Sequence, residues 1–408
     1  MKITIILPTY NERVNIEKLI PILEEEIFPK IKNHNMHILV VDDNSPDGTA
    51  EKVKEFTKKW SNIELLLGDK QGLGAAYVRG MRYAMDTMKA EAVIEFDADF
   101  QHDPHDIPRL IEAMDKGADY VIGSRYVKGG AIPQEWGIHR KIISRFGGLF
   151  AQLVLWRWNI HDMTSGFKLT KTSFLRNVDL DHLYSKYYAY KLHILHDVLL
   201  QKVKVVEVPI IFYERKEGSS KITRKDLFDS LWVVIRLRIR DSKRLIKFLF
   251  VGGTGFIVQV VTQEASIRFG LTGFITNILI NNGLVKDFTS VSHSIGAGFG
   301  AEFAIISNFL LNNFWTFRDT RNLKEKSPFL IRAIKFNLAS FGSILIQSLA
   351  VLIAEKIAGS EIIIFSHSFP TRLIVLIPTI ILFVIPLNYF IYNIVVWKTQ
   401  YLNKKKAI

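Results

Sequence analysis

Four long apolar windows occupy most of the chain after residue 245. Each is close to the ~20 residues that an α-helix needs to cross the hydrocarbon core of a bilayer. The part of the chain over 236–408 is therefore predicted to be an all-α transmembrane domain with four helices. Residues 1–235 are predicted to form a separate soluble domain. The windows run over about 245–269, 291–314, 329–354 and 373–397.

Basic residues flank these windows unevenly. The connections near 271–288 and 356–372 are poor in lysine and arginine, whereas three other places are rich in them. Because basic loops stay on the cytoplasmic side, four spans with both ends in the cytoplasm are predicted. The chain also begins almost directly on an apolar strand pattern, so no cleavable signal peptide is expected. The segment Phe274–Leu284 is left open as a re-entrant or a surface segment. The basic places are 236–247, 318–326 and 398–406.

The charge of the chain indicates a polyanionic partner. Its 408 residues carry a formal net charge of +13, and the sequence pI is near 9.5. Nucleic acid, an anionic membrane surface and phosphorylated substrates all satisfy such a charge. Because the basic clusters lie beside the membrane windows, the sequence favours membrane lipid and phosphorylated substrates over nucleic acid. Cysteine is absent, which excludes disulfides and thiolate metal sites.

The first domain alternates short apolar runs with helical patterns, which is typical of an α/β fold with a mostly parallel sheet. Several runs end abruptly in polar residues, and the carboxyl ends of parallel strands are where such sheets bind ligands. The loop Pro8–Glu12 is thus placed to meet a nucleotide. The predicted strands are 3–7, 37–41, 65–67, 93–96, 119–123 and 205–209.

Asp97, Asp99 and Gln101 directly follow the apolar run 93–96. The two aspartates are two residues apart, so an extended strand would project both to the same face. Carboxylates and an amide oxygen are the ligands that hard cations such as Mg²⁺ and Mn²⁺ prefer. The alternative is a polar turn after a strand, because Asp-x-Asp is common by chance. The pattern makes this loop a candidate metal site.

Four further segments are basic, rich in small residues or amphipathic. Gly72–Gly74 begins a helix with small residues that let the backbone approach a phosphate closely. Neither a dinucleotide fingerprint nor a Walker A motif is present. The loop 124–130 is basic and contains glycine. The basic loop 215–221 suits a phosphate clamp, with a solvated surface as the alternative. The segment at about 142–159 is predicted to be an interfacial amphipathic helix or a buried core helix.

Taken in order, these motifs resemble family 2 glycosyltransferases, which have a Rossmann-like GT-A fold. The most similar subgroup is the dolichol-phosphate (polyprenol-phosphate) mannose synthases, and the resemblance is strong over about residues 1–235. The membrane part resembles the four-span domain attached to some of these synthases, with Asn312–Phe317 as its best signature. The motifs are Pro8-Thr9-Tyr10-Asn11-Glu12, Asp42 to Thr49, Gly72-Leu73-Gly74, Asp97-Ala98-Asp99 with Gln101, Gly123-Ser124-Arg125-Tyr126 and Arg140-Lys141-Ile142-Ile143-Ser144.

The resemblance implies roles for individual residues. Asp99, Arg125 and Arg215 would act in catalysis, and Arg215 with Lys221 would close over the site. The ligands of a Mg²⁺ or Mn²⁺ ion bridging the diphosphate would be Asp97, Asp99 and Gln101. The nucleotide would be held by Pro8, Tyr10, Glu12, Asp43 and Asp97. The phosphate of a lipid acceptor would be bound by Arg125, Arg140, Ser144 and Lys221.

One position departs from the family pattern. The helix after Tyr190-Lys191 carries an acidic residue in the family about where Leu195 stands here. The nearest candidates in this chain are His196 and Asp197, so a sugar-contacting role for this helix is left open.

The resemblance implies transfer of mannose from GDP-mannose to dolichyl (polyprenyl) phosphate with inversion. A lipid monophosphate has a second pKa of about 6, so near neutral pH it is already a nucleophilic dianion and needs no dedicated base. Two alternatives stay open: the same reaction with UDP-glucose, and a lipid-linked sugar flippase or transport module. A processive polysaccharide synthase would need a Gln-x-x-Arg-Trp-type motif, which this sequence lacks.

Overall fold

A computed structural model of the chain describes residues 1–215, 224–286, 288–320, 327–359, 361–364 and 367–399. Lys221, which the resemblance assigns to the acceptor phosphate, lies outside these ranges. The chain divides into two compact units, Met1–Arg240 and Asp241–Ile408.

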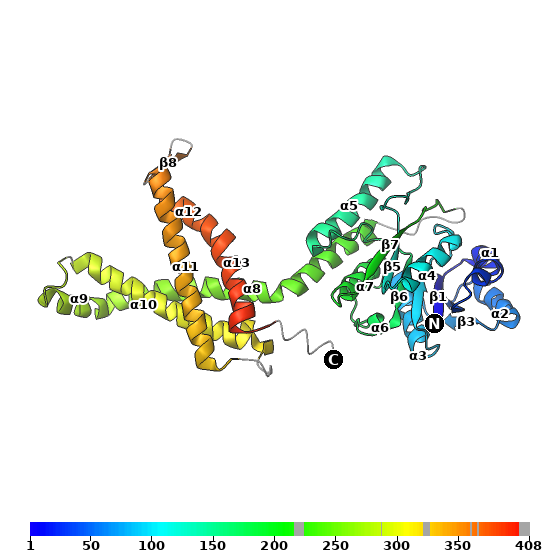
Figure 1. The fold of residues 1–408 in the computed structure, drawn as a ribbon, viewed down its shortest axis with the longest axis horizontal. Helices are drawn as coiled ribbons and strands as arrows, with labels where there is room; N and C mark the ends of the chain where they lie inside the picture. Colours follow the sequence, from blue (N-terminus) through cyan, green and yellow to red (C-terminus); the bar gives the residue numbers. More distant parts are fainter. Residues whose placement is uncertain (216–223, 287, 321–326, 360, 365–366, 400–408) are drawn as a thin grey trace. The chain divides into compact units, whose positions relative to one another are not determined.

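The first unit is built on a seven-stranded sheet with the order β3-β2-β1-β4-β6-β5-β7 (Figure 1). The predicted mostly parallel sheet is confirmed, but β6 was not predicted and runs antiparallel to both β4 and β5. The strands are β1 (Lys2–Thr9), β2 (Asn35–Asp42), β3 (Ile63–Leu67), β4 (Ala92–Glu95), β5 (Tyr120–Ser124), β6 (Lys168–Lys171) and β7 (Val205–Pro209).

Helices cover both faces of this sheet, because its central strands are apolar on both sides. Ile5 of β1 belongs to a core that includes helices α1 and α4, and Ile6 belongs to a second core that includes α3 and α7. The helices of the unit are α1 (Arg13–Pro21), α2 (Thr49–Lys59), α3 (Leu73–Asp86), α4 (Ile107–Asp115), α5 (Ile138–Leu155), α6 (Thr172–Leu175), α7 (Tyr190–Leu199) and the first turns of α8 (Arg224–Arg268).

The strand register brings the polar loops together. Thr9 at the end of β1 aligns with Asp42 at the end of β2, and Ile6 aligns with Glu95 at the end of β4. The loop after β4 therefore emerges beside the end of β1. All three loops leave the carboxyl edge of the sheet, where a ligand site is expected in a fold of this kind.

Helix α5 covers most of the segment predicted at 142–159, but it begins at Ile138 and ends at Leu155. It stops because Trp156 adopts a left-handed backbone conformation, with φ of 55°. Gly148, Ala151 and Leu155 face inward, whereas apolar side chains on another face stay exposed. The exposed residues at helical spacing are Ile142, Phe146, Leu149 and Leu153.

The division between the units falls inside α8, which is a longer helix than the predicted window at 245–269. Val233, Val234 and Leu237 are buried in the core of the first unit. Arg240 donates two hydrogen bonds to the carboxylate of Asp197, one of them at 3.2 Å. The first turns of α8 are thus part of the soluble fold, although the chain there is basic.

The second unit contains long apolar helices, as the sequence predicts. Three helical stretches among the described residues are long and apolar enough to cross a membrane: Lys225–Arg268, Val291–Thr316 and Ile377–Val396. The window at 329–354 lies within the single helix α11 (Phe329–Ala358). The open segment Phe274–Leu284 largely coincides with the short apolar helix α9 (Leu271–Asn281).

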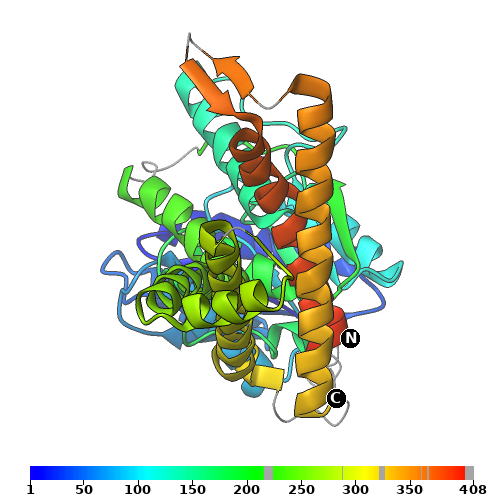
Figure 2. The ribbon, with the colours of Figure 1, turned by 90° about the vertical axis from the view of Figure 1, so that its left-hand side faces the viewer.

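The remaining elements of this unit are helices, π-helical turns and one hairpin, and part of the unit packs around an aromatic cluster. Figure 2 shows α11 beside the chain segment of α12 and α13. Phe317 and Trp397 stack with ring centroids 4.2 Å apart, and both are buried. The elements are α10 (Phe288–Leu311), α12 (Thr371–Thr379), α13 (Ile385–Ile391), the π-helical turns Asn312–Thr316, Ile380–Val384 and Tyr392–Val396, and a hairpin of β8 (Glu361–Ile364) and β9 (His367–Pro370).

Candidate active site

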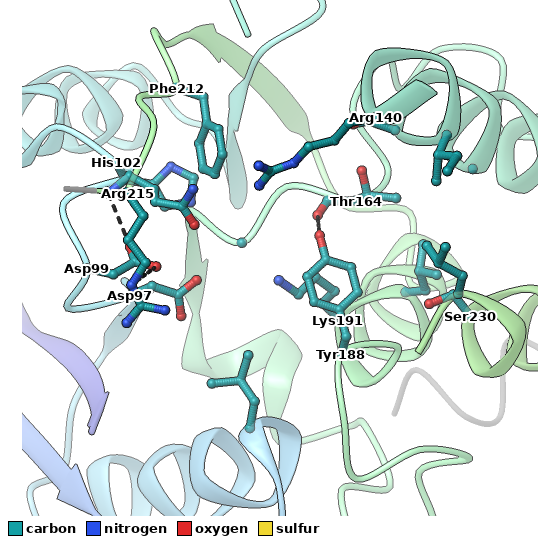
Figure 3. Close-up of a pocket in the computed structure, with 18 of the residues that line it drawn as sticks. Asp97, Asp99, His102, Arg140, Thr164, Tyr188, Lys191, Phe212, Arg215 and Ser230 are labelled. Carbon is teal, nitrogen blue, oxygen red and sulfur yellow. Dashed lines mark hydrogen bonds and ion pairs between the residues drawn. The ribbon is translucent and has the colours of Figure 1, made fainter. Parts of the chain in front are cut away.

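A cavity of about 950 Å³ opens at the carboxyl edge of the sheet in the first unit (Figure 3). Its walls come from the loops after β1, β2 and β4, from α5, from the start of α7 and from the first turns of α8. One end is lined by charged side chains and the other by apolar ones. Every sequence-predicted site residue within the described ranges lines this cavity: Pro8, Tyr10, Glu12, Asp43, Asp97, Asp99, Gln101, Arg125, Arg140, Ser144 and Arg215.

The two aspartates of the Asp-x-Asp motif lie on a turn and not on an extended strand. Strand β4 ends at Glu95, and Phe100 has a positive φ of 58°. Asp97 Oδ1 accepts a hydrogen bond of 2.8 Å from the hydroxyl of Tyr77, which is buried in α3. Asp99 Oδ1 accepts one of 3.1 Å from the backbone N–H of Gln101. The turn therefore brings both carboxylates to the cavity without the strand geometry on which the prediction depended.

The environment of Asp99 favours its protonated form. Burial raises the pKa of Asp99 to about 6, and the nearby charge of Asp97 contributes to the increase. Arg215 opposes this effect, with its Nε 3.9 Å from Asp99 Oδ2. Arg215 also donates a hydrogen bond to Glu12. A guanidinium thus connects the acidic turn with the loop after β1.

These oxygens fit a hard divalent cation. Two carboxylates close enough to raise a pKa form a site that a cation would stabilise. The side-chain NH₂ of Gln101 donates to the Tyr213 carbonyl at 3.4 Å, which leaves its oxygen as the atom able to bind metal. Within the described ranges, no group of three or more histidine, cysteine, aspartate or glutamate side chains is arranged to hold an ion. A cation here would need further ligands, such as phosphate oxygens.

The loops after β1 and β2 form the next part of the wall. Asp42 accepts hydrogen bonds from the hydroxyls of Thr9 and Ser45, at 2.8 and 2.6 Å, and so holds these loops together. Asp43 faces the cavity and accepts a 2.6 Å hydrogen bond from Arg79. Burial raises the pKa of Asp43 despite this contact. Of the two adjacent aspartates, only Asp43 is placed to meet a ligand.

Arg125 lies in the cavity wall but is tightly held. Its Nε and Nη2 each donate a 2.7 Å hydrogen bond to Asp162, which is completely buried. Nη2 also donates to the Thr164 hydroxyl at 2.8 Å. The pairing with Arg125 keeps the pKa of Asp162 below its usual value despite burial. Arg125 therefore contributes a fixed positive charge to the wall.

Arg140 and Ser144 lie one turn apart on α5. The Arg140 guanidinium stacks 4.0 Å from the Trp136 ring centroid, and its Nη1 is 3.9 Å from the Glu214 carboxylate. The Ser144 hydroxyl is 2.7 Å from that of Tyr126. Beyond them the wall becomes apolar, so these two residues mark the border between the two ends of the cavity.

Sequence reasoning missed several residues that line the cavity. Thr164 lines the cavity from the polar stretch after α5, and Asp162 of the same stretch holds Arg125 in the wall. The buried histidine His102, with its pKa lowered to about 3 by burial, and the buried Lys191 gave no local signal. The position aligned with the family's acidic residue, Leu195, is buried in the core. The cavity-lining residues without a predicted role include Lys70, His102, Trp136, Thr164, Gly166, Tyr188, Lys191 and Phe212.

Replacing Tyr77 with phenylalanine should weaken the binding of a divalent cation by about 10- to 100-fold, the usual cost of losing a hydrogen bond that orients a metal ligand. The ring stacks on Tyr190 at 5.3 Å, so the packing should survive. The measurement is activity against Mn²⁺ concentration. Tyr83→Phe is the matched control, because Tyr83 lies on the same helix and its hydroxyl donates to Glu64 of β3, outside the cavity. An unchanged Mn²⁺ dependence in the Tyr77 variant would contradict the role.

Comparison with known proteins now identifies the class. The family profile described as Glycosyl transferase family 2 matches residues 4–179, and the one described as GtrA/DPMS, transmembrane domain, matches residues 247–397. The sheet and its cavity are thus a GT-A-like glycosyltransferase domain, and a membrane domain follows. A dolichol-phosphate mannosyltransferase of Pyrococcus furiosus is 33% identical over 356 residues, which cover 85% of this chain and 89% of that protein. The chain belongs to the family of dolichol-phosphate and polyprenol-phosphate mannosyltransferases, which confirms the resemblance inferred from the motifs.

Other similar proteins cover less of the chain or are more distant. The polyprenol monophosphomannose synthase of Mycolicibacterium smegmatis is 34% identical over 238 residues, 58% of this chain and 86% of that protein. Among solved structures, the mannosyltransferase PcManGT of Pyrobaculum calidifontis, in complex with GDP-Man and Mn²⁺, is 15% identical with a TM-score of 0.37. That alignment covers 77% of this chain and 87% of PcManGT.

Proposed function

We propose that this protein transfers mannose from GDP-mannose to a dolichyl or polyprenyl phosphate, with inversion at the anomeric carbon. The observation that carries the proposal is the continuity of the cavity from a charged end to an apolar end. A water-soluble sugar nucleotide and a lipid phosphate need these two environments in contact. The names of the relatives agree with this reaction class.

The apolar end suits an isoprenoid chain. It is formed by two helices of the first unit, α5 and the first turns of α8. Arg140 and Ser144 lie where the charged wall ends, which is where the phosphate of a bound lipid would stand. The apolar lining residues are Ile142, Ile143, Phe146, Phe150, Leu227, Phe228, Leu231 and Val234.

The exposed apolar stripe of α5 supports entry of the acceptor from a membrane. Ile142, Phe146 and Leu153 are each more than half exposed, and Trp156 follows with an exposure of 68%. A helix with one apolar face and basic residues at its start is suited to lie in the headgroup region. By the distribution of basic residues, the catalytic domain lies on the cytoplasmic side.

At the charged end, Asp97, Asp99 and Gln101 would hold a Mg²⁺ or Mn²⁺ ion. Such an ion neutralises the diphosphate and stabilises it as a leaving group. Glu12 and Asp43 are placed to accept hydrogen bonds from hydroxyl or amine groups of the nucleoside. Tyr10, whose ring lies 3.3 Å from the Lys70 ammonium, offers an aromatic surface beside them.

The acceptor phosphate, as a dianion, would attack the anomeric carbon of mannose. A bond forms between a phosphate oxygen and that carbon, while the carbon–oxygen bond to the diphosphate breaks and GDP leaves. No proton has to be removed from the nucleophile. The cations Arg125, Arg140 and Arg215 would hold the two anionic substrates together.

The test uses the purified full chain in detergent, with a polyprenyl phosphate, Mn²⁺ and either labelled GDP-mannose or labelled UDP-glucose. Mannolipid formation that EDTA stops is the expected result. Transfer of glucose alone would overturn the proposed donor. A detergent micelle does not separate two compartments, so a flippase or transport module would produce no mannolipid in this assay, whereas an enzyme would. If neither donor sugar is transferred, the proposed function is wrong.

A further inference from the structure

Lys191 is a buried cation that faces the cavity. It is the second residue of α7, and only 2% of it is exposed, yet it lines the space between the acidic turn and α5. Figure 3 shows its ammonium between Asp97 and the hydroxyl of Tyr188. Its Nζ lies 3.9 Å from the Tyr188 ring centroid. Among the described residues, no carboxylate lies within ion-pairing distance of this nitrogen.

Three polar groups, one of them the Lys191 ammonium, converge at Gly166. A Cβ atom on Gly166 would lie 3.0 Å from Lys191 Nζ, 3.3 Å from Asp97 Oδ2 and 3.6 Å from His102 Nε2. Asp97 and His102 belong to the loop after β4 and Lys191 to α7, so with Gly166 three separate segments of the chain meet here. The absence of a side chain at Gly166 keeps the space between them open, and all four residues line the cavity.

A buried ammonium without an anionic partner is costly, so its retention beside this open space indicates an anionic ligand. Asp97, which also lines this space, does not form an ion pair with the Lys191 ammonium. The wall of the same cavity carries the carboxylates that would bind the metal and Arg140 of α5. In the proposed reaction, this is where donor and acceptor phosphates approach each other.

We propose that Lys191 Nζ binds a phosphoryl oxygen at the reacting centre, in a subsite kept open by Gly166. The inference rests on the proposed function, and it adds a substrate-binding residue to it. The oxygen belongs either to the β-phosphate of the donor or to the phosphate of the lipid. Both sources offer the same chemistry, and binding measurements separate them.

The test compares the wild-type full chain with Lys191→Met, which keeps the length of the side chain and removes the charge. Dissociation constants are measured by calorimetry in Mn²⁺ for GDP, for GMP and for a short-chain polyprenyl phosphate. Loss of a charge-assisted hydrogen bond should weaken binding about 10-fold or more. Weaker GDP binding with unchanged GMP binding assigns the β-phosphate, whereas weaker binding of the lipid phosphate alone assigns the acceptor.

Three further variants keep the test decisive. Lys191→Arg should retain most of the affinity for the phosphate ligand. Gly166→Ala should weaken binding of the same ligand as Lys191→Met does, because the added methyl group fills the subsite. Lys59→Met, which removes a surface ammonium paired with Glu25, should change nothing. Should Lys191→Met fail to fold, Gly166→Ala and Lys191→Arg decide the question.

Affinities within two-fold of wild type for all three ligands, in every folded Lys191 and Gly166 variant, would overturn the subsite. These measurements do not require sugar transfer. A protein that binds GDP through Lys191 but transfers no mannose would therefore overturn the proposed function and leave the subsite standing.

Discussion

Replacing Asp99 with alanine should reduce sugar transfer by at least about 10³-fold while the protein stays folded. A bound metal ion contributes several kcal/mol to stabilising a departing diphosphate, and each 1.36 kcal/mol corresponds to a factor of ten in rate. Asp99 lies on the turn after β4 and faces the cavity beside Asp97. The measurement is the initial rate of mannolipid formation in saturating Mn²⁺, with thermal unfolding to check the fold.

Asp115→Ala is the control for this variant, because that carboxylate lies at the end of α4 and pairs with His34 outside the cavity. Near-normal turnover of the Asp99 variant would show that this carboxylate does not hold a required ion. The pKa of Asp99, about 6, adds a second readout. Protons compete with a cation for this carboxylate, so the Mn²⁺ concentration for half-maximal activity should rise as the pH falls below about 6.

Replacing Asp162 with alanine should have the largest effect on stability. The variant leaves the Arg125 guanidinium buried without its partner, and breaking a buried ion pair in this way costs about 3–5 kcal/mol. Asp162 accepts hydrogen bonds from the Arg125 backbone N–H, Nε and Nη2. For a domain of this size, that loss lowers Tm by roughly 10 °C. The measurement is thermal unfolding of the purified full chain, followed by the transfer assay.

A double variant separates the contribution of the Arg125–Asp162 pair to stability from its contribution to sugar transfer. Arg125→Met with Asp162→Leu removes both charges, so much of the stability should return, because apolar groups can replace a buried ion pair. Transfer should not return, since the fixed cation of the wall is gone. Asp179→Ala serves as the control, because Asp179 forms only an exposed pair with His182. Wild-type stability and activity in the single Asp162 variant would contradict both expectations.

The acidic and aromatic residues at the carboxyl edge were predictable because parallel strands bring their following loops to one edge. Pro8–Glu12, Asp43 and the Asp97–Gln101 turn meet there although they are distant in sequence. The strand geometry assumed for Asp97 and Asp99 was wrong, since β4 is short and ends at Glu95. The residues still meet in the cavity because the turn follows β4 at the carboxyl edge of the sheet, where the cavity opens.

The unpredicted parts depend on contacts between distant segments. Strand β6 is short and carries two lysines, one of them the completely buried Lys168, so its pattern does not resemble a strand in the interior of a sheet. The start of α8 at Arg224 was missed because its first turns are basic, although Val233 and Leu237 are buried. Neither element can be read from local hydropathy.

The class of fold, the membrane windows and the motifs of the nucleotide loops could be predicted from local sequence, because hydropathy, periodicity and turn residues act over a few neighbouring positions. The partner of each buried charge depends on the three-dimensional fold. Arg125 is committed to Asp162, 37 residues away, whereas Lys191 is buried beside an open space at Gly166. The physical reason is that the free energy of a buried charge depends on its partners in space, and these come from segments that the local sequence does not relate.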